Sequence, residues 1–101
     1  MYFVQRVLER VLILAGVLFG LSVDEVRKQL LLDGQPPPSL APGRPILAPY
    51  VDNGNVLCWD AWDALRYGRC VQQVLKWVHL AYRVEALFEP CFDVIGIRIA
   101  I

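Results

Sequence analysis

The chain has 101 residues, 56% of them hydrophobic, and its ten basic side chains balance ten acidic ones. This length allows one domain or part of one, and the zero formal charge excludes attraction to nucleic acid through overall charge alone. The hydrophobic share exceeds the roughly 45–50% of soluble domains, which indicates contact with a membrane or with a packing partner.

Residues 1–19 predict a helix, because apolar residues recur at helical spacing while Arg6, Glu9 and Arg10 fall on the opposite side. Gly20 is the predicted end. The apolar run 11–21 follows two arginines, as in a signal peptide or membrane anchor. However, Glu9 lies between the arginines, no small-x-small cleavage site follows, and a span needs about 20 residues. A buried helix is favoured, and an anchored or secreted protein stays the alternative.

A second helix is predicted at 23–33. Ser22 and Glu25 have the spacing of a capping box, in which each side chain accepts a hydrogen bond from the other residue's backbone amide. Asp33-Gly34 predicts the end of this helix. Residues 34–45 hold five prolines, four of them within 35–44, and are predicted to form a rigid loop.

A β-hairpin is predicted at 46–58. The prolines of the first extended segment, Pro45 and Pro49, are typical of a strand beginning or an edge strand. Asn53-Gly54 suits a two-residue type I′ turn, and residues 56–59 are expected to form the returning strand.

A third helix is predicted at 61–80, capped by Asp60, and two further strands at 82–88 and 92–101. This order of elements predicts an α+β fold with an antiparallel sheet and packed helices. Trp59 and Trp62 bracket the start of the third helix and are expected to pack in the core or at an interface. His79 is expected to have a structural role at the helix end.

The three cysteines, Cys58, Cys70 and Cys91, form no CxxC pair. A disulfide framework or a zinc site normally shows closer spacing and more ligands. Buried free thiols in a reducing, intracellular compartment (cytoplasm or nucleus) are therefore expected.

The most informative chemical feature is Asp52 at the tip of the predicted hairpin. Magnesium prefers oxygen ligands and commonly takes one or two protein carboxylates together with substrate phosphates. Two such ions can stabilise the attacking and leaving oxygens of nucleotidyl transfer. Taken alone, the same residues are also explained as a favourable turn.

The order of motifs resembles the palm domain of retroelement reverse transcriptases. Tyr50-Val51-Asp52-Asn53 is similar to the aromatic-x-Asp-Asp metal motif, and a helix of similar length follows it at 61–80. The segment 92–99, with Ile95-Gly96, resembles the closing element of the family, which carries Leu-Gly. Residues 1–6 resemble the helix that follows the Pro-x-Gly motif, as if the chain began just after it.

This resemblance implies the later part of an RNA-directed DNA polymerase palm of the two-magnesium type, extending over residues 1–101. It implies that Asp52 is catalytic, that Asp52 and Asn53 bind Mg²⁺, and that Tyr50, Gly96 and Arg98 contact nucleic acid. In the intact ancestor the partners would be an RNA template and a DNA primer. Asn53 departs from the motif, in which this position is aspartate, and so removes one negative charge.

The resemblance also implies that the chain is inactive alone. The other essential aspartate and the fingers would lie upstream of residue 1, and one carboxylate cannot assemble a two-metal site. Two readings outside the polymerase family stay open. One is a small membrane-anchored or secreted protein, and the other is a non-enzymatic interaction module that uses its tryptophans and proline-rich loop.

Overall fold

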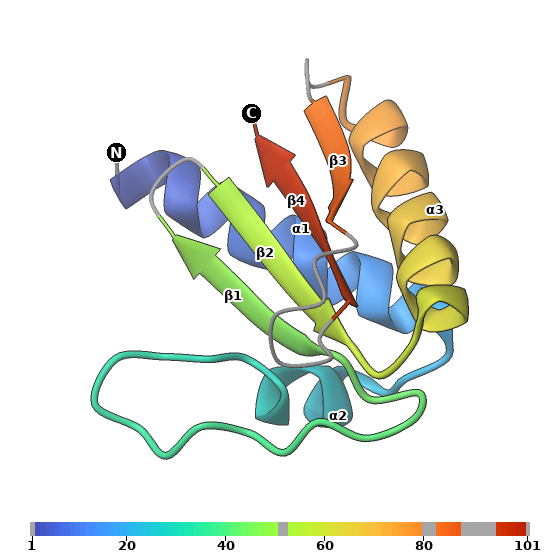
Figure 1. Cartoon of the computed structure of the whole chain (residues 1–101). Coiled ribbons are helices and arrows are strands. Elements are labelled where there is room, and N and C mark those ends of the chain that lie inside the picture. The colour runs from blue at the N-terminus through green and yellow to red at the C-terminus, as the bar shows by residue number, and fades with distance from the viewer. Residues whose placement is uncertain (1, 51–52, 80–82, 88–94, 101) are drawn as a thin grey trace.

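The computed structural model describes residues 2–50, 53–79, 83–87 and 95–100, with the backbone alone at 2–4, 50, 83–87, 95–97 and 100. The predicted α+β class is confirmed (Figure 1). In chain order the elements are α1 (Tyr2–Phe19), α2 (Val23–Lys28), β1 (Ile46–Tyr50), β2 (Asn53–Cys58), α3 (Ala61–Trp77), β3 (Arg83–Leu87) and β4 (Ile95–Ala100).

The four strands form one antiparallel sheet in the order β1-β2-β4-β3. The predicted edge position of the first strand is confirmed. Leu47 turns its N–H and C=O away from β2, toward Gln29 O at 2.9 Å and Leu31 N at 2.7 Å. Because backbone groups alternate along a strand, the nitrogen of Pro49 also points away from β2. Proline has no N–H to donate, and at this position the sheet does not need one.

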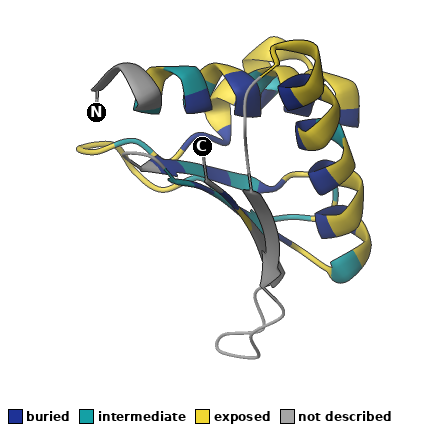
Figure 2. Ribbon diagram, turned by 90° about the horizontal axis from the view of Figure 1, so that it is seen from above, coloured by how far each residue is buried: buried dark blue, intermediate teal, exposed yellow. Residues whose placement is uncertain are grey.

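Helices α1 and α3 cover one face of this sheet, so the molecule has two layers (Figures 1 and 2). Burial alternates along β2: Gly54, Val56 and Cys58 are buried against the helices, while the residues between them are half-buried. Among the described helices and strands, none covers the opposite face (Figure 1). We call this opposite face the open face.

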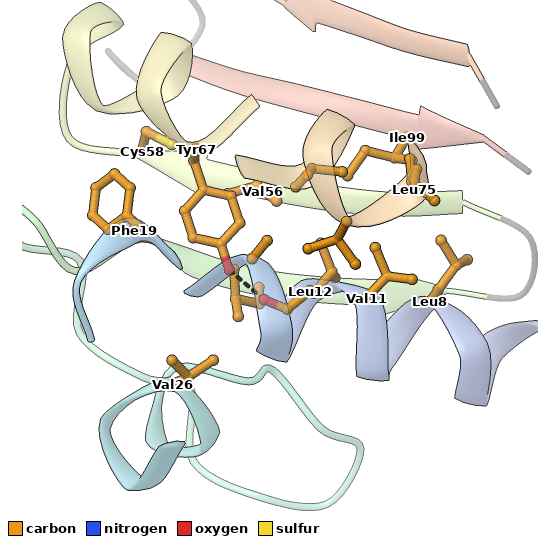
Figure 3. Close-up of a cluster of buried hydrophobic side chains, with 14 of the residues drawn as sticks. Leu8, Val11, Leu12, Phe19, Val26, Val56, Cys58, Tyr67, Leu75 and Ile99 are labelled. Carbon is orange, nitrogen blue, oxygen red and sulfur yellow. Dashed lines mark hydrogen bonds between the residues drawn. The ribbon is translucent and has the colours of Figure 1, made fainter. Parts of the chain in front are cut away.

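The core fills the space between the helices and the sheet (Figure 3). Tyr67 of α3 is its largest fully buried side chain, and its hydroxyl donates a hydrogen bond to the carbonyl of Leu12 in α1. Burial raises the pKa of Tyr67, so the hydroxyl stays a donor at any ordinary pH. The remaining core residues are Leu8, Val11, Ala15, Phe19, Val26, Leu30, Leu47, Val56, Cys58, Ala64, Val71, Val74, Leu75 and Ile99.

The hairpin at 46–58 is confirmed, but its turn is not where the sequence predicted. Tyr50 pairs with Asn53, and Pro49 with Gly54, so Asn53-Gly54 belongs to β2 and only residues 51–52 lie between the strands. In the observed register Leu47 lies opposite Val56, and both are buried against the helices, so paired apolar side chains support this register. Gly54 is buried in the same row, where an added Cβ atom would make ordinary contacts with Leu8 at 3.4 Å and Leu12 at 3.6 Å.

The first helix ends as predicted. Gly20 has φ +120°, and the amides of Gly20 and Leu21 both donate to the carbonyl of Gly16. The helix is buried where it faces the sheet, α2 and α3, and on its outer side Leu14, Val17 and Leu18 are 51%, 42% and 44% exposed. No helix among the described residues combines the length and the apolar character that a membrane crossing requires.

The capping box of α2 is confirmed, with Glu25 N donating to Ser22 Oγ at 3.2 Å and Ser22 N to Glu25 Oε1 at 3.3 Å. These bonds from Ser22 hold the pKa of Glu25 below its usual value. The predicted extent of 23–33 is too long, because α2 ends at Lys28. From Gln29 onward the backbone instead bonds to Leu47 at the sheet edge.

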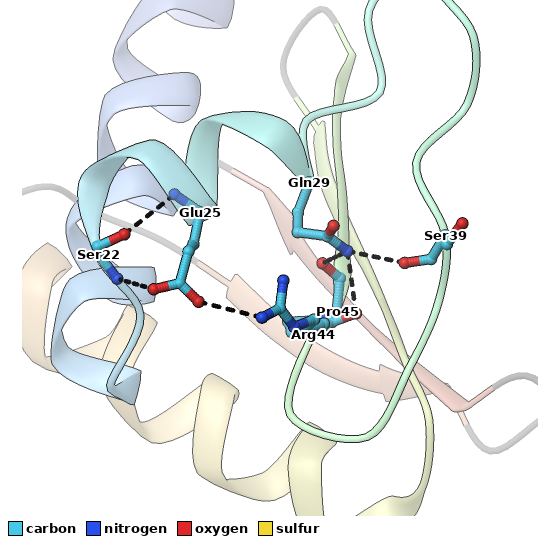
Figure 4. Close-up of polar contacts among 6 residues, drawn as sticks. All are labelled: Ser22, Glu25, Gln29, Ser39, Arg44 and Pro45. Atoms are coloured by element: carbon cyan, nitrogen blue, oxygen red, sulfur yellow. Dashed lines mark hydrogen bonds and ion pairs between the residues drawn. The ribbon is translucent and has the colours of Figure 1, made fainter.

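The buried side chain of Gln29 fixes the proline-rich loop (Figure 4). Its Nε2 donates to the carbonyls of Ser39, Arg44 and Pro45 at 3.0, 3.1 and 3.2 Å. A further hydrogen bond joins the loop to α3, where Asp63 Oδ2 accepts from Gly43 N at 2.8 Å. A loop that carries few apolar side chains is therefore held by buried polar contacts.

The third helix begins at its predicted cap, since Asp60 Oδ1 accepts from Asp63 N at 2.8 Å. It ends at Trp77 rather than 80, because His79 has φ +56° and breaks the helical geometry. Of the two expectations for Trp59 and Trp62, packing in the core is wrong, and packing at an interface stays a prediction. Trp59, Trp62 and Trp77 are 52%, 67% and 59% exposed.

Candidate functional site

The hairpin end of the sheet brings two of the predicted site residues together. Tyr50 is the last residue of β1 and Asn53 the first of β2, and the two are paired across the hairpin. Asp52, the predicted catalytic residue and metal ligand, lies outside the described residues. Asn53 is half-buried and lies on the open face, in line with Asn55 and Leu57.

The other two predicted residues lie along this face at increasing distance from the hairpin end. In β4, Arg98 pairs with Asn55 and Gly96 with Leu57. At the rise of a strand, these positions lie about 7 Å and about 14 Å beyond Asn53. Arg98 is exposed. The polar track that we define as Asn53, Asn55 and Arg98 therefore follows the open face from the hairpin inward, and Gly96 extends it.

The strands that carry the polar track are packed against the core on their other face. On the helix side of the sheet, Val56 and Ile99 are fully buried between the positions of the track. The side chains of Leu8 and Leu12 of α1 lie behind the hairpin end, 3.4 and 3.6 Å from where a Cβ atom on Gly54 would be. A closely packed interior has low compressibility, so the backbone that carries the track is expected to be rigid.

Among the described residues, no group of three or more His, Cys, Asp or Glu side chains could hold a metal ion. The donors that the described part of the track offers are the amide oxygens of Asn53 and Asn55, which are neutral. Amide oxygens can complete the shell of a hard cation but bind it weakly without a carboxylate. A metal site at the hairpin would therefore require the carboxylate of Asp52.

Two polar features escaped the sequence reasoning. Asn55 falls outside the strand predicted at 56–59, and only the register puts it on the open face beside Arg98. The second feature is a cavity of about 480 Å³ lined by three arginines, on the side of α1 that faces α2. Arg6 and Arg10 are one helical turn apart, which is visible in the sequence, but nothing in the sequence links them to Arg27.

Two of the three cysteines are described, and both are free thiols. Burial, together with the carboxylates of Asp63 and Asp60, raises the pKa of Cys58 to about 12. Burial also raises the pKa of Cys70, an effect that Arg66 partly opposes. Both thiols are therefore expected to be unreactive, because a raised pKa disfavours the thiolate and the thiolate is the reactive form. Cys91 lies outside the described residues.

We therefore expect Cys58 to resist alkylation in the folded protein. At pH 8 a thiol of pKa 12 is ionised in about one molecule in ten thousand, and the Cys58 side chain is fully buried. Iodoacetamide labelling followed by peptide mapping should show Cys70, which is only partly buried, modified well before Cys58. Equal rates are expected in denaturant, and equal rates in the folded protein would contradict this arrangement.

Comparison of the chain with known protein families, curated proteins and solved structures finds no match.

Proposed function

We propose that the chain derives from the palm of a retroelement reverse transcriptase, and that its hairpin presents Asp52 to a divalent cation. The observation that carries the proposal is the pairing of Tyr50 with Asn53, which leaves Asp52 in a two-residue connection at the end of the sheet. A carboxylate so placed adjoins the amide of Asn53 in sequence, and both groups offer the oxygen ligands that Mg²⁺ takes.

The open face supports the nucleic-acid part of the proposal. Arg98 is exposed two residue positions along the sheet from Asn53, and an exposed arginine is suited to a phosphate oxygen. Gly96 follows at the next position on the same face, where the absence of a side chain allows a backbone to approach closely. A strand of nucleic acid on this face would thus run from the cation toward Arg98 and Gly96.

The cation site is tested by titrating Mn²⁺, which is paramagnetic and shares the oxygen preference of Mg²⁺. We expect selective broadening of the Asn53 and Gly54 amide resonances and of Ala100, the partner of Asn53 in β4. Asp52→Asn should abolish the broadening. Asp33→Asn is the matched control, because Asp33 is an exposed acid before a glycine in another loop.

Asn53→Asp restores the second carboxylate of the family motif and is expected to strengthen Mn²⁺ binding by roughly tenfold, since affinity follows the charge of the ligands. Broadening that persists in Asp52→Asn, or that centres on Asp33, would refute the cation site. The lineage has a separate test in genomic context. If the upstream reading frame, in any phase, encodes neither an aspartate-bearing strand nor Pro-x-Gly, the polymerase origin fails.

The exposed tryptophans favour a second candidate, an interaction module. Trp62 is 67% exposed on the first turn of α3, and exposed tryptophans are enriched at protein interfaces. In this case a protein partner would bind normally after Asp52→Ala and fail to bind after Trp62→Ala. The reverse result would favour the site at the hairpin.

A further inference from the structure

A cavity of about 480 Å³ lies between α1, α2 and the segment that follows α2. This volume falls within the range of roughly 300–1,000 Å³ found for small-molecule sites. Although the whole chain has no formal net charge, three arginines and a single acid, Glu9, line this cavity. The local excess of positive charge points to an anionic ligand.

Two of the arginines come from facing helices. Arg10 lies on α1 and Arg27 on the last turn of α2. Both are exposed, and neither forms an ion pair with another residue of the described chain. The planar guanidinium matches the oxygens of a phosphate with two parallel hydrogen bonds. Arg6 adds positive charge at the same wall.

Beside the arginines and Glu9, the cavity also has an apolar part. Ile13, Leu30 and Leu32 line the cavity together with the amide of Gln5. The leucines are fixed in place, because Leu31 between them donates its amide to the carbonyl of Leu47 at 2.7 Å. An inorganic anion alone would leave this apolar lining unused, whereas a ligand with an organic part would cover it.

The two helices are held at a fixed separation. Val26 of α2 packs so closely on Gly16 of α1 that a Cβ atom on Gly16 would lie 2.5 Å from Val26 Cγ2. The capping box fixes the start of the same short helix. Arg27 follows Val26 directly, so its backbone is positioned across the cavity from Arg10 before any ligand binds, which lowers the cost of binding.

From this arrangement we propose that the cavity binds a phosphate monoester whose organic part is apolar or aromatic. Arg10 and Arg27 bind the phosphate, and Ile13, Leu30 and Leu32 contact the organic part. The site is independent of the hairpin carboxylate, and it requires no metal ion.

The test is a titration of the isotope-labelled full chain with adenosine monophosphate in the presence of EDTA, followed by amide and arginine side-chain resonances. We expect binding with a dissociation constant near or below about 1 mM, and shifts at Arg10, Arg27 and Leu32. Adenosine and inorganic phosphate should each bind at least about tenfold more weakly, because each supplies only half of the contacts. EDTA removes any cation from the hairpin, so the outcome is separate from that of the Mn²⁺ titration.

Arg10→Gln and Arg27→Gln should each weaken binding by about tenfold, and Glu9→Gln should strengthen it. Arg69→Gln, an exposed arginine on α3, is the matched control and should change nothing. All four side chains lie at the surface or half-buried, and an unchanged circular dichroism spectrum verifies folding. The proposal is overturned if adenosine or inorganic phosphate binds as well as the nucleotide, or if the shifts map to another face. It is also overturned if Arg69→Gln weakens binding as much as Arg27→Gln.

Discussion

Gly16→Ala is expected to destabilise the protein by about 1–2 kcal/mol, although alanine favours a helix over glycine by about 1 kcal/mol. The added methyl would lie 2.5 and 2.8 Å from the two Cγ atoms of Val26 and 3.2 Å from the hydroxyl of Tyr67. Valine has little rotamer freedom, and both neighbours are fully buried. Overpacking of this kind costs about 1–3 kcal/mol, and it outweighs the helix propensity. Chemical denaturation followed by far-UV circular dichroism measures the effect.

A double-mutant cycle isolates the cause. In a Val26→Ala background the obstructing methyl groups are gone, so Gly16→Ala should become stabilising by about 0.5–1 kcal/mol, the ordinary gain of alanine within a helix. The sign of the effect thus reverses between the two backgrounds. A Gly16→Ala protein that is more stable than the parent would show that α2 does not pack on α1 at this point.

Gln29→Glu is expected to be the more damaging change, costing about 3 kcal/mol or more at neutral pH. The substitution replaces a donor with a carboxylate oxygen that would face the carbonyl oxygens of Ser39, Arg44 and Pro45. The site is buried, and an uncompensated buried charge is strongly unfavourable. The pKa of the introduced carboxyl would be raised in the folded state. Stability should therefore be greatest in acid and fall as the pH rises.

Gln29→Met is the matched control, because it removes the donor without adding charge. It should cost about 1–3 kcal/mol, since buried carbonyls lose their partner, and its stability should not follow the same pH dependence. Thermal unfolding at pH 4 and pH 7 by circular dichroism compares the two variants. If Gln29→Glu equals Gln29→Met at both values, the side chain of residue 29 does not face the loop carbonyls.

Features set by neighbouring residues could be predicted from the sequence. The caps at Ser22 and Asp60, the end of α1 at Gly20 and the edge position of Pro49 all follow from local backbone chemistry, and each is confirmed. The four strands and three helices also occur in the predicted order. Of the candidate site, the hairpin itself could be predicted, but the pairing of Tyr50 with Asn53 and the common face of Asn53 and Arg98 depend on strand registers that the sequence did not predict.

Features that depend on tertiary contacts could not be predicted. Asn53-Gly54 has good turn chemistry, but both residues belong to β2, in a register that places Leu47 opposite Val56 in the core. The close approach of Val26 to Gly16 gives no signal in the sequence, where a small residue in a helix has many explanations. Trp62 was expected to pack in the core or at an interface, and only the packing of α3 shows that its side chain is 67% exposed on the first turn.

The outward nitrogen of Pro49 has a consequence for behaviour in concentrated solution. An incoming chain that tried to extend the sheet beside β1 would find Leu47 already bonded to residues 29 and 31 and a proline two positions later. Fibril-like growth by strand addition is thus blocked on this border. Among the described strands, any such growth is left to the border at β3, so charge placed there would protect the protein from aggregation.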